Sequence, residues 1–154
     1  MSNGLGWQKV WTYGFYAYLT SAPSGSDFYA SVQERFDNSV TKIMENTNAD
    51  AYRVSIKPGE YCWGSNMSVA NNGMILLLAN QLSPNEDYVK AAQAQLHYIM
   101  GTNTTGYCFV TGLESAEQSP EHPHHRPSQV LEAAYPGMLV GGPDQNLEDP
   151  YARA

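Results

Sequence analysis

The sequence predicts an all-α fold. Apolar residues recur at spacings of three and four in four separate stretches, turn-forming residues join those stretches, and strand-like patterns are weak. Consecutive helices with short connections tend to lie antiparallel as helical hairpins. We therefore expect four helices of about 14 to 20 residues, followed by a long irregular segment of roughly fifty residues after Gly101.

The first two predicted helices are separated by a turn. The first carries an apolar face of Trp7, Val10, Trp11, Gly14, Phe15, Tyr18 and Leu19, and ends before residues 21–25. Ser26 is the expected N-cap of the second helix, which would run to about Glu45 and break at residues 46–50. Its predicted buried stripe is Phe28, Val32, Phe36, Val40, Ile43 and Met44.

Residues 51–65 precede the second pair of helices and predict either a short strand or an extended loop. The third helix is expected from about Asn66 to Gln81, with Val69, Ala70, Met74, Leu77 and Leu78 facing inwards. The fourth is expected to begin with Ser83 as N-cap, Pro84 at the first helical position and Glu86 completing a capping box. Gly101 suits its end, and its predicted stripe is Tyr88, Ala91, Ala92, Gln95, Leu96 and Ile99.

Composition limits the classes of partner. The chain has 154 residues, 42% of them hydrophobic, which suits one folded domain. A formal net charge of −7 without a basic stripe argues against nucleic acid and anionic membrane surfaces as partners. No apolar run has the length of a membrane span, and the N-terminus lacks the pattern of a signal peptide. Cys62 and Cys108 are too few for a disulfide scaffold, and we expect two free, partly buried thiols.

Two loop regions carry the candidate binding residues. Trp63 lies between turn residues, where an exposed indole could stack on the apolar face of a sugar ring, or a buried one could fill the start of a helix. His124 and Arg126 would project to the same side of an extended segment and could bind hydroxyl groups or a carboxylate. A metal site built from His122, His124 and His125 is an alternative, although adjacent histidines seldom bind one ion.

Six short segments resemble glycoside hydrolase family 9, a family of cellulases that are mostly endoglucanases. In order along the chain they are Tyr61–Asn66, Ala70–Gly73, Leu96–Asn103, Phe109–Gly112, Pro123–Ser128 and Gly137–Asp144. The resemblance covers roughly residues 60–150, and the His-x-Arg element at His124 and Arg126 is its most specific part. Cys108 and Glu114 depart from the usual family residues, which leaves the local loop contacts open.

The resemblance implies a fragment of an (α/α)6 barrel and inverting hydrolysis of β-1,4-glucosidic bonds by two carboxyl groups. It assigns His124 and Arg126 to the catalytic centre, where they contact the sugar and neighbouring carboxylates. It assigns Trp63, together with His124 and Arg126, to substrate binding. The implied partners are a β-1,4-glucan and the remainder of the catalytic domain, and the implied location is extracellular. No cofactor is expected in this chain; the family often binds calcium, but no ligand for it is assigned.

The catalytic carboxylates of the family have no counterpart in this sequence. The family's base lies in an Asp-Ala-Gly-Asp-type motif upstream of the matching region, and its acid lies downstream of the Gly-Gly-Pro-Asp run. Asp144, Glu148 and Asp149 precede the position of the acid. We therefore expect residues 1–154 to be a C-terminal portion of the catalytic domain that ends before the acid and is inactive alone. The alternatives are an autonomous helical carbohydrate-binding module and a metal-dependent hydrolase built on the histidine cluster.

Overall fold

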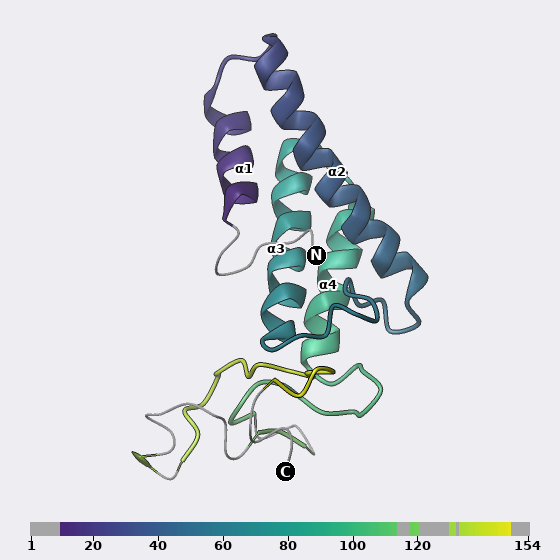
Figure 1. Cartoon of the computed structure of the whole chain (residues 1–154), viewed down its shortest axis with the longest axis vertical. Helices are drawn as coiled ribbons and strands as arrows, with labels where there is room; N and C mark the ends of the chain where they lie inside the picture. The colour runs from purple at the N-terminus through teal and green to yellow at the C-terminus, as the bar shows by residue number, and fades with distance from the viewer. Residues whose placement is uncertain (1–9, 114–117, 121–129, 132, 149–154) are drawn as a thin grey trace.

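The computed structural model describes residues 10–113, 118–120, 130–131 and 133–148. These residues form four α-helices, α1 (Trp11–Ser21), α2 (Asp27–Ala49), α3 (Ser65–Leu82) and α4 (Glu86–Ile99). α1 and α2 form one hairpin and α3 and α4 form a second, and the loops that follow α2 and α4 gather at one end (Figure 1). The described part of the chain is therefore all-α, as the sequence predicts.

The buried face of α1 agrees only in part with the predicted one. Leu19 is buried as predicted and Phe15 and Tyr18 pack against the core, whereas Val10 and Trp11 are exposed, Thr12 is buried, and Trp7 lies outside the described residues. Tyr16 packs against Phe36 of α2, and its hydroxyl donates a 2.5 Å hydrogen bond to Gln81 Oε1 of α3. Residues 12, 16 and 19 have the spacing of one helix face. The hydrophobic pattern did not identify this face because Thr12 is polar and Tyr16 is amphipathic.

α2 begins as predicted and ends later. Ser26 Oγ accepts a hydrogen bond from the backbone N–H of Tyr29, which confirms the N-cap. The predicted break at residues 46–50 is wrong, because the helix continues to Ala49 with Thr47 buried. Asn46 Nδ2 donates to the carbonyl oxygen of Ser55, so the side chain of Asn46 has a hydrogen-bond partner in the following loop while its backbone stays helical. Five of the six predicted stripe residues are buried or half-buried, and Phe28 is exposed.

Residues 51–64 form a loop, the second of the two predicted alternatives. Val54, Ser55 and Ile56 are all buried, so the alternation of the sequence does not separate an inner from an outer face. Asn72 Nδ2 of α3 donates to Ser55 Oγ, and Gln95 Oε1 of α4 accepts from the N–H of Ser55. Buried polar groups of the helices thus replace the strand partner that this backbone would otherwise need.

The predicted inner face of α3 is also partly wrong. Val69 is buried, but Met74 and Leu77 are exposed, while Asn66 and Asn72 are buried. Residues 74–79 of α3 are all apolar, so this part of the helix has apolar side chains on every side, and Asn66 and Asn72 are buried where they hydrogen-bond the loops. The exposed apolar residues line a groove of about 300 Å³ between α3 and α4, formed by Ala70, Gly73, Met74, Leu77, Ala92, Gln93, Gln95, Leu96 and Ile99.

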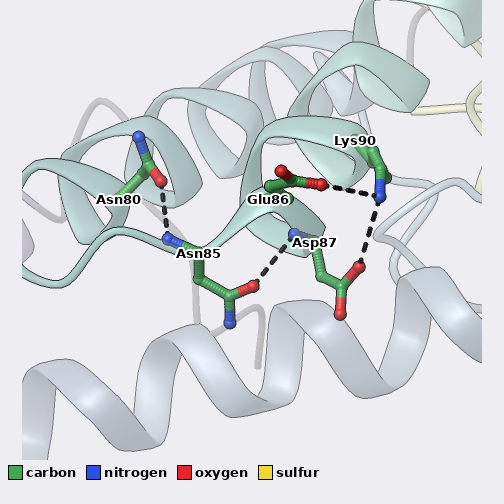
Figure 2. Close-up of polar contacts among 5 residues, drawn as sticks. All are labelled: Asn80, Asn85, Glu86, Asp87 and Lys90. Atoms are coloured by element: carbon green, nitrogen blue, oxygen red, sulfur yellow. Dashed lines mark hydrogen bonds and ion pairs between the residues drawn. The ribbon is translucent and has the colours of Figure 1, made fainter.

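The start of α4 is set by Asn85, which corrects the predicted capping box. Asn85 Oδ1 accepts from the N–H of Asp87 at 2.9 Å, and Asn80 Oδ1 accepts from the N–H of Asn85 (Figure 2). Ser83 instead ends α3. The side chain of Glu86 forms an ion pair with Lys90 at 3.3 Å instead of reaching back to a cap. Gly101, with a φ of 118°, follows the last turn as predicted.

Two apolar clusters hold the molecule together. The first lies between the helices and includes Phe36, Val40, Ile75, Leu76 and Ala91. The second lies at the loop end and joins Val54, Ile56, Val69, Tyr98, Ile99 and Phe109, with Tyr61 and Val140 packed against it. The second cluster therefore fixes the loops that carry the sequence motifs onto the ends of α3 and α4. Among the described residues, no helix combines the length and apolarity of a membrane span.

Candidate functional site

The N-terminal end of α3 binds the segment of residues 140–148, which we call the strap. The N–H of Asn66 donates to the carbonyl oxygen of Gly141 at 3.0 Å, and Asn66 Nδ2 donates to that of Val140 at 3.0 Å. Ser65 Oγ donates to the carbonyl oxygen of Pro143 at 2.7 Å. Gly64 is the N-cap residue, with a φ of 79°, and has no side chain that could accept from the first turn. The strap thus satisfies one backbone donor that a helix N-terminus leaves open, the N–H of Asn66, and accepts two further hydrogen bonds from side chains of the first turn.

Gly142 explains why the strap lies so close to α3. Its φ is 86°, and a Cβ at this position would lie 2.3 Å from Cγ of Asn66. Asn66 is fully buried, so its side chain has no space to move aside. The second glycine of the Gly-Gly-Pro-Asp run therefore permits close approach to a helix end, which is a structural role.

The loop after α4 is fixed by Asn103 and Thr111, both buried. Asn103 Nδ2 donates to the carbonyl oxygens of Tyr98 and Tyr107, and its Oδ1 accepts from Thr105 and Tyr107. Thr111 Oγ1 donates to the carbonyl oxygen of Tyr135 and accepts from the N–H of Met138. An isolated antiparallel bridge pairs Val110 with Leu139. Both side chains therefore hydrogen-bond mainly backbone groups, Asn103 at residues 98–107 and Thr111 at residues 135–138.

Trp63 lies at this loop end with its side chain exposed. The residue is 62% exposed, which favours the stacking interpretation over the buried one. The backbone N–H of Trp63 donates to Glu148 Oε2 of the strap at 3.2 Å. Neighbouring backbone is held as well, because the N–H of Gln145 donates to the carbonyl oxygen of Tyr61 at 2.8 Å. An exposed indole on a fixed backbone is a surface suited to an apolar face of a ring-shaped ligand.

The carboxylates near Trp63 are engaged with backbone. Asp144 Oδ1 accepts from the N–H of Asn146, and its Oδ2 accepts from that of Glu148. Glu148 itself accepts from Trp63. The sequence analysis placed Asp144 and Glu148 only in the run before the position of the acid and missed these contacts, although the spacing Asp144-x-Asn146 after Gly-Pro is typical of such a turn.

A pair of tyrosines underlies the Trp63 loop. Burial raises the pKa of Tyr98 well above its usual value, and neighbouring Tyr61 raises it further by charge and by their side-chain hydrogen bond. Burial also raises the pKa of Tyr61, and the charge of Asp50 adds to the effect. Both phenols therefore stay neutral at ordinary pH and serve as packing and hydrogen-bonding groups beneath the loop.

His124 and Arg126 lie outside the described residues, as do the metal candidates His122 and His125. Their assignment therefore remains a prediction. Within the described ranges, no group of three or more His, Cys, Asp or Glu side chains is placed to hold a metal ion. Cys62 and Cys108 are free thiols, as expected, but the first is exposed and the second buried.

Comparison with known proteins agrees with the motifs at the loop end. Residues 1–152 match the family described as Glycosyl hydrolase family 9. A xyloglucan-specific endo-β-1,4-glucanase of Bacteroides ovatus is 29% identical over 153 residues, covering 94% of this chain and 26% of the relative. Endoglucanase D of Acetivibrio thermocellus is 32% identical over 140 residues, covering 88% of this chain and 22% of the relative. The chain thus spans about a quarter of the relatives' length.

Solved structures give the same result for the fold. A metagenome-derived family 9 endoglucanase superposes with a TM-score of 0.84 at 32% identity, covering 94% of this chain and 26% of that structure. AaCel9A, solved in complex with cellobiose-like isofagomine, superposes with a TM-score of 0.87 at 32% identity, covering 99% of this chain and 29% of that structure. These are (α/α)6-barrel proteins, and the four helices form a section of that barrel. The chain belongs to glycosyl hydrolase family 9.

Proposed function

We propose that this chain is part of an inverting endo-β-1,4-glucanase that hydrolyses cellulose or related β-glucans. In this proposal residues 1–154 are a C-terminal portion of its catalytic domain and contribute one wall of the substrate cleft. Support comes from the family and from the names of the relatives, which are endoglucanases, a cellodextrinase and a cellobiosidase. The observation that carries the proposal is the exposed Trp63, whose loop is hydrogen-bonded to the strap at the N-terminal end of α3.

Trp63 would bind one glucosyl unit of the glucan. The axial C–H groups of a β-linked glucose ring form an apolar face, and an indole of matching size can stack on it while the hydroxyl groups stay hydrated. Burial of that face would orient the chain of sugars across the loop end. The 62% exposure of Trp63 leaves enough indole surface for such contact.

His124 and Arg126 would complete the proposed wall. Neutral imidazole both donates and accepts hydrogen bonds, and guanidinium offers a fixed set of donors to hydroxyl groups or carboxylates. A guanidinium beside a catalytic carboxylate would favour its ionised form and so assist a general base. These roles rest on the family resemblance at residues 123–128.

The acid and base carboxylates would come from residues outside this chain. Inversion requires a base that activates water and an acid that protonates the leaving oxygen, on opposite faces of the scissile bond. Asp144 and Glu148 are poor candidates, because backbone N–H groups occupy both oxygens of the first and one oxygen of the second. The exposed apolar groove between α3 and α4 suits packing by further barrel helices. The parent enzyme is proposed to act outside the cell.

The direct test compares the purified 154-residue chain with the product of the complete reading frame that encodes it. Reducing ends released from carboxymethylcellulose are measured for both at equal concentration. We expect hydrolysis by the complete product and none by the 154-residue chain. Turnover by the chain alone would refute the proposal that its acid and base lie elsewhere, and an inactive complete product would refute the proposed activity.

A further inference from the structure

We propose that Asp144 is a positioning residue for Trp63, acting through the turn of residues 144–148. This inference rests on the proposed stacking of a sugar ring on Trp63 and adds residues that control it. Asp144 itself would not contact the sugar ring. Its carboxylate organises the backbone that, in turn, holds the backbone of Trp63.

The first step is the turn itself. Oδ1 of Asp144 accepts from the N–H of Asn146 at 3.0 Å, and Oδ2 accepts from the N–H of Glu148 at 2.8 Å. Two acceptor oxygens on one rigid carboxylate fix the positions of both N–H groups relative to each other. Because the acceptor is ionised, these hydrogen bonds are stronger than those between neutral groups.

The second step connects this turn to the Trp63 loop. The N–H of Gln145 donates to the carbonyl oxygen of Tyr61 at 2.8 Å, and Gln145 Oε1 accepts from the N–H of Gly59 at 3.0 Å. Glu148 Oε2 accepts from the N–H of Trp63 at 3.2 Å. Three hydrogen bonds therefore run from one short turn to the five residues that end at Trp63.

The third step fixes the other side of Trp63. Ser65 donates to the carbonyl oxygen of Pro143, and buried Asn66 donates to residues of the strap from both its backbone and its side chain. Residues before and after Trp63 are thus bound to the same strap. Asp144 directly follows Pro143, whose carbonyl oxygen is bound by Ser65. The turn that Asp144 forms therefore determines the position of residues 145–148 relative to the Trp63 loop.

Positioning matters because the indole itself has little packing to hold it. At 62% exposure, Trp63 depends on its backbone for the direction in which its ring projects. Stacking requires the ring plane to be parallel to the sugar, so a backbone free to rotate would lose part of the binding energy as conformational entropy. The strap reduces this loss by fixing the loop before the ligand arrives.

The test uses 5-fluorotryptophan in the product of the complete reading frame that encodes this chain and observes the indoles by ¹⁹F NMR. Trp63→Phe identifies the resonance of Trp63 by its disappearance. Asp144→Ala removes both acceptors of the turn, and Glu148→Ala removes the direct contact at an exposed position where loss of fold is not expected. Glu148→Gln retains an acceptor oxygen for Trp63. Asp87→Ala is the matched control, an exposed carboxylate at the start of α4 (Figure 2).

Without ligand, we expect Asp144→Ala and Glu148→Ala to shift or broaden the Trp63 resonance, and Glu148→Gln and Asp87→Ala to leave it in place. With cellotetraose, we expect the dissociation constant from the Trp63 resonance to rise about threefold to tenfold in Asp144→Ala. An unchanged resonance and an unchanged dissociation constant in Asp144→Ala would overturn the inference. If the unmodified complete product shows no response to cellotetraose at the Trp63 resonance, the proposed stacking fails, and the ligand-free spectra still decide whether Asp144 positions Trp63.

Discussion

Replacement of Gln95 by leucine should destabilise the chain more than any similar change on the surface of α4. Gln95 is 1% exposed, and its amide joins three parts of the fold. Oε1 accepts from the N–H of Ser55 at 2.8 Å, and Nε2 donates to the carbonyl oxygens of Arg53 and Ala91 at 2.9 Å each. Leucine has similar volume, so Gln95→Leu removes these hydrogen bonds without opening a large cavity.

The expected loss follows from the groups left without partners. Ser55 is 1% exposed, so its N–H would remain buried and unsatisfied at a cost of about 1–3 kcal/mol. The carbonyl of Arg53 would lose a donor, which adds about 1 kcal/mol. The total is about 2–4 kcal/mol in the free energy of unfolding, or a fall of roughly 5–15 °C in Tm for a chain of this size.

The assay is urea denaturation followed by circular dichroism at 222 nm. Gln93→Leu provides the matched control, since the same substitution lies two residues away at an exposed position of the same helix. We expect the control to lie within about 0.5 kcal/mol of the unmodified chain. Equal stability of the two variants would refute the conclusion that the Gln95 amide joins the 53–55 loop to the helices.

Two further predictions concern the loop end. Gly25→Ala and Gly142→Ala both place alanine at a positive φ, but only at Gly142 would the new Cβ meet a neighbour, at 2.3 Å from Asn66. Gly142→Ala should therefore lower the free energy of unfolding by at least about 2 kcal/mol more than Gly25→Ala, as measured by urea denaturation. Equal losses in the two variants would contradict the close packing of Gly142 against Asn66. The folded-state pKa of Tyr98 is raised, so its contribution to stability is complete below its ordinary pKa of 10 and is lost as pH rises above it. The free energy of unfolding should fall by about 1 kcal/mol more between pH 10 and 11 in the unmodified chain than in Tyr98→Phe, and an equal fall in both would contradict the raised pKa.

The sequence predicts the helices better than it predicts their faces. Spacing of apolar residues locates all four helices, and local chemistry identifies Ser26 and Gly101 correctly. The errors occur where a polar residue has a distant partner. Thr47 looks like part of a helix break, yet it is buried next to Gln95, 48 residues away. Asn66 and Asn72 look like surface residues of α3, yet loops cover them. Local patterns contain no information on such partners.

The exposed apolar residues of α3 and α4 show a second limit of prediction from sequence. Met74, Leu77 and Leu96 were predicted to face inwards because they are hydrophobic, and all three are exposed in the described structure. In a section of a barrel, an apolar side chain can face a neighbouring section instead of the core of its own hairpin. Sequence patterns identify which residues avoid water and do not identify which surface covers them.

The candidate site was predicted in part. The position of Trp63 among turn residues correctly indicated a loop but left open whether the side chain is exposed or buried, and the structure shows it exposed. The contacts that hold it were not predicted, since residues 59–66 and the strap are about eighty positions apart in the sequence. The roles of His124 and Arg126 remain predictions from the family motif.

In the proposed function, the loop end of this chain forms part of a β-glucan-binding cleft. Its most direct test is kcat/KM on carboxymethylcellulose for the complete reading frame, with Trp63→Ala compared with Trp11→Ala. Trp11 is an exposed indole on α1 and serves as the control. We predict a loss of roughly tenfold for Trp63→Ala, from a stacking contribution of about 1.5 kcal/mol, and little change for Trp11→Ala. Equal activity of Trp63→Ala and the unmodified enzyme would contradict the claim.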